Sequence, residues 1–240
     1  MKLTKVTMTG PDDTTTLADL ERVSEKYPFV EWGILLSRSS TGGRRFPSRK
    51  WLEKLYAVAY NSITQFKEMK FSGHLCGAYV RQLLLGNTDF VSEIGSMWDM
   101  FSRIQINTHG VKHPYHGILL TTALSQYPDK EFIFQYDNEN REILNAMRNY
   151  SRAKISTLFD LSHGAGVLPE QWPHLIPGIS CGYAGGLGPD NISEQLQLIA
   201  GKVGDGETWV DMETKIRSED DRIFDLDKVE TVLEICKPFI

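Results

Sequence analysis

Two segments carry the side chains best suited to proton transfer. Asp160 ends an apolar run, and His163 lies three residues further on in a Ser-His-Gly stretch. His74 ends another apolar run, two residues before Cys76. A carboxyl can protonate a leaving oxygen, and an imidazole takes up protons near neutral pH. We therefore expect Asp160 to act as a general acid, with His163 or His74 as the base.

Each of these residues also has a plain structural role open to it. Asp160 can cap the turn that follows it, and His163 can be a surface histidine in that turn. Cys76 and His74 can form a nucleophile pair, but a buried cysteine more often packs as a small apolar side chain beside a hydrogen-bonded histidine. The sequence favours the structural role for Cys76 and leaves the other two residues open.

A glycine-dense stretch over residues 179–191 runs from an apolar segment into an amphipathic helix that starts after Asn191. Gly185 and Gly186 can adopt positive φ and let a ligand lie against the main chain. The unpaired N–H groups at the start of a helix bind anions, phosphate above all. We expect Gly185, Gly186 and Asn191 to hold a phosphate, with Lys215 as a nearby positive charge; a tight turn without a ligand fits the stretch equally well.

Further polar and aromatic residues suit substrate recognition. Four of them alternate within pairs at predicted strand ends, which places each pair on one face: Gln105 with Asn107, and Gln135 with Asp137. They can contact a ligand or bond to one another. Arg45, in the glycine-rich loop 42–47, can clamp a carboxylate or phosphate, and Tyr183, which we assign to the glycine stretch, can stack on a planar ring.

The composition limits the classes of function. The chain has 240 residues, 41% hydrophobic and 24% charged, as in a globular domain with a sizeable core, and its net charge of −5 disfavours nucleic acid as a partner. The basic stretch over residues 38–50 is the local exception. Three cysteines without metal-ligand spacing indicate a reducing compartment. We find neither a secretory signal nor an apolar run of membrane length, so we expect a cytoplasmic protein.

Short apolar segments alternate with helical patterns along the whole chain. The predicted strands are residues 3–8, 30–36, 72–75, 104–106, 132–136, 157–160, 178–181 and 208–211. The predicted helices are residues 15–26, 48–68, 77–85, 88–101, 116–125, 139–152, 169–174, 192–200 and 226–236. This alternation predicts one α/β domain over residues 1–240, a (β/α)8 TIM barrel, with a doubly wound open sheet as the alternative. In such a barrel, chemistry belongs at the carboxyl ends of the strands and phosphate after the last two strands.

Four parts of the chain carry a resemblance to a known family. They are Phe29-Val-Glu-Trp-Gly-Ile-Leu-Leu-Ser37 with Arg45-Phe46, Leu158-Phe-Asp-Leu-Ser-His-Gly-Ala-Gly166 followed by Trp172, Ala184-Gly-Gly-Leu-Gly-Pro-Asp-Asn-Ile192, and Val210-Asp211. Here the chain resembles the phosphoribosylanthranilate isomerases, (β/α)8 barrels that perform an Amadori rearrangement of a phosphoribosyl amine. The resemblance implies a general acid at Asp160, a phosphate at Gly185 and Gly186, and substrate contacts from Arg45 and Asp211.

The chain departs from that family where its chemistry is most specific. Thr7-Met8-Thr9-Gly10 stands where the family's first strand ends in Lys-Ile-Cys-Gly with a catalytic cysteine, so Thr9 occupies the position of the base. A threonine hydroxyl cannot act as a base at neutral pH without an activating partner. Glu213-Thr214-Lys215 replaces the family's Ser-Ser-Gly, and Gln105-Ile106-Asn107 replaces its Gln-Leu-His.

These observations predict an isomerase-type enzyme that acts on a phosphorylated sugar or nucleotide-like substrate by acid–base chemistry. We expect no cofactor and no metal, no membrane partner, and a monomer or homodimer. The alternative is a barrel that has kept its phosphate site without catalysis and that binds or sequesters a phosphorylated metabolite.

Overall fold

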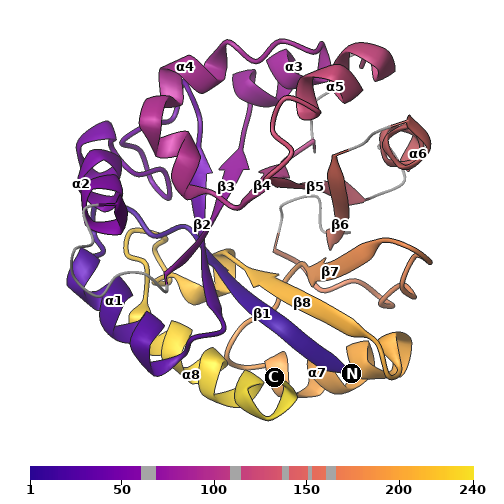
Figure 1. Cartoon of the computed structure of the whole chain (residues 1–240). Helices are drawn as coiled ribbons and strands as arrows, with labels where there is room; N and C mark the ends of the chain where they lie inside the picture. Colours follow the sequence, from indigo (N-terminus) through magenta and orange to yellow (C-terminus); the bar gives the residue numbers. More distant parts are fainter. Residues whose placement is uncertain (61–68, 109–114, 137–140, 151–152, 161–165) are drawn as a thin grey trace.

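Eight parallel strands close into a barrel in the computed structural model of the chain. The structure describes residues 1–60, 69–108, 115–136, 141–150, 153–160 and 166–240. The strands are β1 (Lys2–Thr9), β2 (Val30–Leu36), β3 (Lys70–Leu75), β4 (Arg103–Ile106), β5 (Glu131–Tyr136), β6 (Lys154–Asp160), β7 (Ser180–Ala184) and β8 (Glu207–Met212). Each strand pairs with the next along the chain, and β8 pairs with β1 (Figure 1). The predicted (β/α)8 barrel is therefore confirmed.

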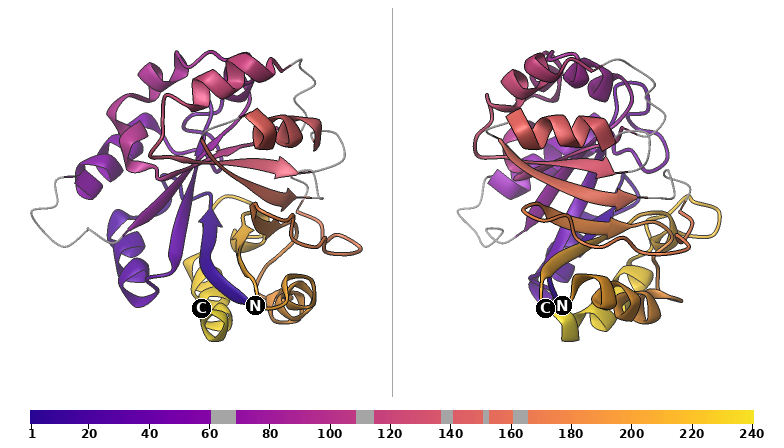
Figure 2. Two further views of the ribbon diagram at one scale, coloured as in Figure 1. Left: turned by 45° about the vertical axis from the view of Figure 1, so that its right-hand side comes forward. Right: turned by 90° about the vertical axis from the view of Figure 1, so that its right-hand side faces the viewer.

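Helices surround the barrel, and both termini lie at one end of it (Figure 2). The α-helices are α1 (Leu17–Lys26), α2 (Arg49–Tyr60), α3 (Ala78–Leu84), α4 (Phe90–Ile94), α5 (Gly117–Leu124), α6 (Arg141–Tyr150), α7 (Ile192–Val203) and α8 (Leu226–Cys236). Short 3-10 helices are η1 (Gly95–Met100), η2 (Thr214–Ile216) and η3 (Lys237–Phe239). Among the described residues, no helix has both the length and the apolarity needed to cross a bilayer.

Three sequence predictions differ from the structure. The helix expected at residues 169–174 is wrong: the described segment 166–179 forms no helix, and Pro169 and Pro173 each lack an N–H to donate. The helix expected over 88–101 breaks into α4 and η1 at Gly95, which has φ of 69°. Strand β7 begins and ends later than the predicted 178–181, so Tyr183 belongs to a strand and not to the glycine turn.

The main core lies between the strands and the helices, because alternate residues of each strand point outward. Val6, Met8 and Val210 are fully buried there, with the apolar faces of the helices packed over them. A separate, smaller apolar cluster consists of Ile133, Leu158, Ala184 and Trp209.

Charged groups fill the lower part of the barrel interior. The guanidinium of Arg103 donates to Glu31 Oε1 at 2.7 Å and lies 4.3 Å from the centroid of the Trp209 ring. Thr7 Oγ1 donates to the same carboxylate at 2.9 Å. The Trp209 ring lies across Gly182, where an added Cβ would come within 2.2 Å of it. These contacts close the barrel below and leave its carboxyl-end mouth for a ligand.

Candidate functional site

A cavity of about 250 Å³ lies at the carboxyl-end mouth of the barrel. Its lining residues come from the ends of β3 to β8 and from the loops after them: Cys76, Gly77, Gln105, Asn107, Gln135, Leu158, Asp160, Gly166, Ala184, Gly185, Gly186, Leu187, Asp211, Met212, Glu213, Thr214 and Lys215. Seven of the predicted site residues are among them. The volume suits a small molecule, and the mixture of acids, amides and backbone suits a polar one.

Asp211, at the carboxyl end of β8, is an acid of the cavity with a strongly raised pKa. Thr9 Oγ1, from the end of β1, donates a hydrogen bond of 2.6 Å to Asp211 Oδ1. Burial raises the pKa of Asp211 to about 7, and the negative charges of Glu213, Glu31 and Asp160 act in the same direction. The Thr9 hydrogen bond opposes this rise by stabilising the charged form. Near neutral pH, therefore, Asp211 can both accept and release a proton.

Asp160, the last residue of β6, lies in the same cavity and is 8% exposed. Gln135 Nε2 donates to Asp160 Oδ2 at 3.2 Å. The register Ala184–Asp211 and Asp160–Ala184 places the two aspartates on strands that flank β7. The site thus holds both aspartates, together with Glu213, on one ligand-sized cavity. His163 lies outside the described residues.

The glycine turn after β7 forms one wall of the cavity. Gly185 and Gly186 have φ of 112° and 64°, and both line the cavity, as predicted for a main-chain binding loop. The opposite side of Gly186 is packed: a Cβ there would lie 2.5 Å from Leu168 N and 2.7 Å from Val167 C. Only glycine fits between this packing and the cavity.

Asn191 supports the turn and does not line the cavity. Its Nδ2 donates to Gly186 O at 2.8 Å, and its Oδ1 accepts from Gly188 N at 3.0 Å. The amide side chain therefore joins the two ends of the turn. The prediction that Asn191 contacts phosphate needs this correction, because the amide is already bonded within the loop.

Lys215 lines the cavity from η2, directly after β8, and its side chain is exposed. The turn after β7 packs against it, since a Cβ on Gly188 would lie 2.4 Å from Lys215 Cβ. Lys215 thus stands beside the glycine turn, where a cation was expected.

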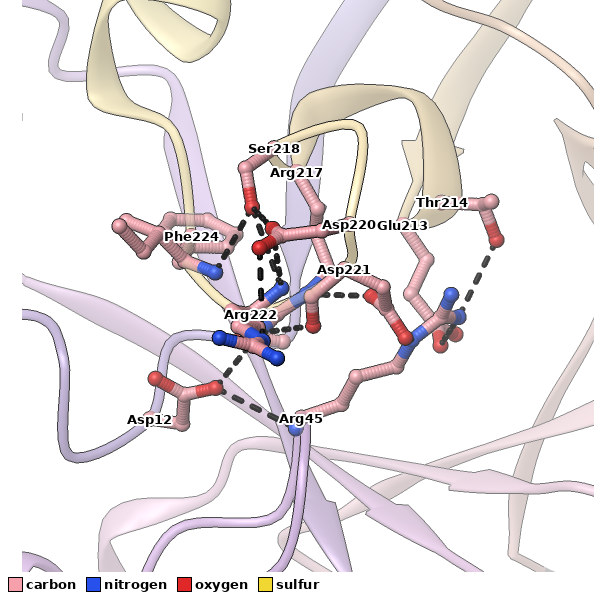
Figure 3. A network of polar contacts seen from close by, with 12 residues as sticks. Asp12, Arg45, Glu213, Thr214, Arg217, Ser218, Asp220, Asp221, Arg222 and Phe224 are labelled. Atoms are coloured by element: carbon pink, nitrogen blue, oxygen red, sulfur yellow. Dashed lines mark hydrogen bonds and ion pairs between the residues drawn. The ribbon is translucent and has the colours of Figure 1, made fainter.

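Arg45 is tied into an ion network over the loops after β2 and β8 (Figure 3). Its Nε donates to Asp221 Oδ1 at 2.9 Å, and its Nη1 donates to Glu213 Oε1 at 2.7 Å. Arg217 completes the network with ion pairs of 2.8 Å to both Asp221 and Asp12. The predicted ligand clamp is corrected accordingly: Arg45 does not line the cavity but pairs with Glu213, which does.

This network was missed by the sequence analysis. Its signal in the sequence was weak, because the partners are up to 205 positions apart, as between Arg217 and Asp12. Glu213 itself was within reach, since it follows Asp211 by two residues and shares its face. Burial raises the pKa of Glu213, while the hydrogen bond from Arg45 lowers it.

Amide side chains and a thiol form the wall opposite the glycine turn. Gln105 Nε2 donates to Asn107 Oδ1 at 3.0 Å, and Asn107 Nδ2 donates to Cys76 Sγ at 3.2 Å. Gln105 and Asn107 therefore line the cavity and bond to each other, and contact with a ligand stays a prediction. Burial raises the pKa of the Cys76 thiol to about 12, so it is a neutral acceptor rather than a nucleophile.

His74 and Tyr183 lie away from the cavity. His74 is 1% exposed and does not line the cavity, and burial lowers the pKa of the imidazole to about 3. Its predicted role as the base is corrected: a ring this hard to protonate, without access to the ligand, is not a base at neutral pH. Tyr183 is fully buried; its hydroxyl donates to Pro173 O at 2.9 Å and its ring packs on Trp172 and Phe159.

Within the part of the chain that the structure describes, no group of three or more His, Cys, Asp or Glu side chains is placed to hold a metal ion.

Comparison with known proteins gives a similar fold and no sequence relative. Monomers generated from the dimeric phosphoribosylanthranilate isomerase of Thermotoga maritima match with a TM-score of 0.59 and 13% identity, over 97% of this chain and 98% of that chain. Aldose reductase of Giardia lamblia matches with a TM-score of 0.49 and 10% identity, over 99% of this chain and 92% of that chain. No family model and no curated protein matches the sequence. The phosphoribosylanthranilate isomerase-like barrel expected from the sequence is thus confirmed as a fold.

Proposed function

We propose that this barrel is an acid–base enzyme of the isomerase type, acting on a small phosphorylated sugar or a nucleotide-like compound. The observation that carries the proposal is the pair Asp160 and Asp211 on one cavity, on the two strands that flank β7 and its main-chain turn at Gly185 and Gly186. Barrel enzymes place their chemistry at this end and bind phosphate after the last two strands. The fold shared with an isomerase supports the assignment.

The two aspartates divide the proton transfers of an aldose–ketose isomerisation. Asp160 donates a proton to the sugar ring oxygen as the ring opens. Asp211, with its pKa near neutrality, removes the proton from the carbon next to the former anomeric centre. The proton given to the ring oxygen is balanced by the one that the anomeric hydroxyl releases to solvent as the ring opens. Asp211 then returns its proton to the former anomeric carbon while a proton passes from the second hydroxyl oxygen to the first, so the ketose has the composition of the aldose. Gln135 holds Asp160 and Thr9 holds Asp211 during these steps.

The phosphate end of the ligand lies at the glycine turn. Gly185 and Gly186 offer main-chain N–H groups there, and Lys215 supplies a positive charge. Thr214 Oγ1 accepts from Arg45 Nη1 at 3.1 Å, which leaves its own proton to be donated to an anion. The nearby Glu213 is paired with Arg45, and this pairing reduces its repulsion of a phosphate.

The expected partner is thus a small molecule, and we propose a reducing, cytoplasmic setting. Cys76, Cys181 and Cys236 are all free thiols, as expected where disulfides do not persist.

Exchange of substrate carbon-bound hydrogen with solvent tests the proposal. The protein is incubated in D2O with phosphorylated aldoses and with phosphoribosyl aryl amines, and products and deuterium uptake are followed by NMR. We expect turnover with one of these classes, reduced about 10²–10⁴-fold in Asp160→Asn and in Asp211→Asn. Asp205→Asn is the matched control, because Asp205 is an exposed residue before β8, at the opposite end of the barrel.

The same experiment separates the alternative function. Ligand binding is measured in parallel by calorimetry, with Lys215→Ala weakening it and Lys2→Ala, at the exposed start of β1, leaving it unchanged. Binding without any product or deuterium uptake supports a barrel that sequesters a phosphorylated metabolite. Full turnover in both aspartate variants contradicts the acid–base assignment.

A further inference from the structure

His74 carries two polar atoms for which the protein supplies no partner. Both ring nitrogens are buried and have no hydrogen-bond partner among the described residues. Burial and the positive charge of Arg103 lower the pKa of this imidazole to about 3, so the ring is neutral at working pH. A neutral imidazole has one N–H to donate and one nitrogen that accepts. A buried ring with neither bond made is costly, and buried polar groups are satisfied by water where protein is lacking.

Thr9 and His74 both pack against Gly33 of β2. A Cβ on Gly33 would lie 3.0 Å from both Cε1 and Nε2 of His74 and 2.2 Å from Thr9 Oγ1. The imidazole edge and the Thr9 hydroxyl therefore face the same point on β2. These two distances place Nε2 and Oγ1 no more than about 5 Å apart, a separation that one water molecule can bridge.

The Thr9 hydroxyl has a defined direction. It donates its only proton to Asp211 Oδ1 at 2.6 Å, so its lone pairs remain for a donor on the other side. The His74 ring is the neighbour of the hydroxyl at Gly33, and Asp211 lies in the cavity wall. The three groups thus form a series of imidazole, hydroxyl and carboxyl.

We propose that a buried water bound between His74 and Thr9 donates to the Thr9 hydroxyl, which makes His74 a positioning residue for Asp211. The inference rests on the proposed function in that Asp211 is the group that transfers protons. In a chain of hydrogen bonds, accepting one bond strengthens the bond donated onward. The water therefore makes Thr9 a better donor and favours the charged form of Asp211. It lowers the pKa of Asp211, whereas burial raises that pKa.

Other charges around the chain bear on the same carboxyl. Glu31, Asp160 and Glu213 each raise the pKa of Asp211, and Arg103 acts on His74 from β4. Because none of these groups is removed when His74 is replaced, the effect of the imidazole can be measured against a constant background.

The test measures the titration of Asp211 directly and needs no substrate. The protein is labelled with 13C at the aspartate carboxyl carbon, and the Asp211 signal is assigned by its loss in Asp211→Asn. We expect the midpoint to rise by on the order of half a unit in His74→Phe, and to rise further in Thr9→Val. We expect His74→Gln, which keeps a donor, to return it toward the wild-type value.

The double variant Thr9→Val/His74→Phe decides whether His74 acts through Thr9. In the Thr9→Val background, the His74 substitution should no longer move the Asp211 midpoint. An equal shift in both backgrounds, or no shift in His74→Phe, overturns the proposal. A crystal structure of the wild type supplies the independent check: a water within hydrogen-bond distance of Nε2 and Oγ1 supports the site, and an empty or protein-filled gap overturns it. Both readouts stand whether or not the protein turns over any sugar phosphate.

Discussion

Replacing Gly186 by alanine separates backbone conformation from packing. Gly186 has φ of 64°, and a Cβ there meets the main chain of Leu168 at 2.5 Å and that of Val167 at 2.7 Å. Gly178 has a similar φ of 76°, in an exposed turn, with no atom within 4 Å of a Cβ. Both substitutions carry the cost of a left-handed alanine, about 1 kcal/mol. Only Gly186→Ala must also push backbone aside.

The two variants should therefore differ by the cost of overpacking. That cost is roughly 1–3 kcal/mol, so we expect Gly186→Ala to lose about 2–4 kcal/mol of unfolding free energy and Gly178→Ala about 1 kcal/mol. For a chain of this length, the difference lowers the thermal midpoint by about 2–4 °C per kcal/mol. Midpoints from urea and thermal unfolding, followed by circular dichroism, measure it. A Gly186→Ala variant as stable as Gly178→Ala would show that the segment 166–168 does not pack against the turn.

Two further predictions concern buried charge. Asp12→Ala leaves the fully buried Arg217 with Asp221 as its remaining carboxylate. We expect the variant to lose about 3 kcal/mol of unfolding free energy, measured by urea unfolding. Asp13→Ala is the control, because the carboxyl of Asp13 bonds Ser48 and no buried charge. The pKa of Asp211 is about 7 in the folded state, above its ordinary value of 3.8. Protonation of Asp211 therefore favours the folded state at low pH, and this contribution to the unfolding free energy is lost as the pH rises from 4 through 7. Between pH 4 and 8, the wild type should therefore lose up to about 4 kcal/mol of unfolding free energy relative to Asp211→Asn. If the unfolding free energies of the two proteins change in parallel with pH, the raised pKa is contradicted.

The fold was predictable because each strand and helix carries its own local pattern. Apolar segments of three to seven residues, separated by helical periodicity, predicted all eight strands. The errors fell where local pattern is ambiguous. Tyr183 follows a glycine and was assigned to the turn, but Gly182 and Tyr183 both belong to β7. Gly182 is a glycine within a strand because the Trp209 ring occupies the space that a Cβ would need.

The site was predictable only as far as strand ends determine it. Asp160, Asp211, Gln105 and Asn107 line the cavity because each ends or follows a strand on its inner face. The bonding of Arg45 depends on Glu213 and Asp221, which are 168 and 176 positions away, and no local pattern encodes such pairing. The complete burial of His74 was equally out of reach, because strand alternation gives the direction of its side chain but not whether the cavity extends to it.

The pairing of β1 with β8 has a consequence for how the protein is made. Thr7 pairs with Asp211 in the register of the two strands, and Thr9 reaches the Asp211 carboxyl. A nascent chain emerging from the ribosome therefore holds β1 without its second neighbour until β8, which starts at Glu207, has been translated. Until β8 pairs with β1, the free edge of β1 can pair with other chains. Asp211 also lacks its hydrogen bond from Thr9 until the two strands pair.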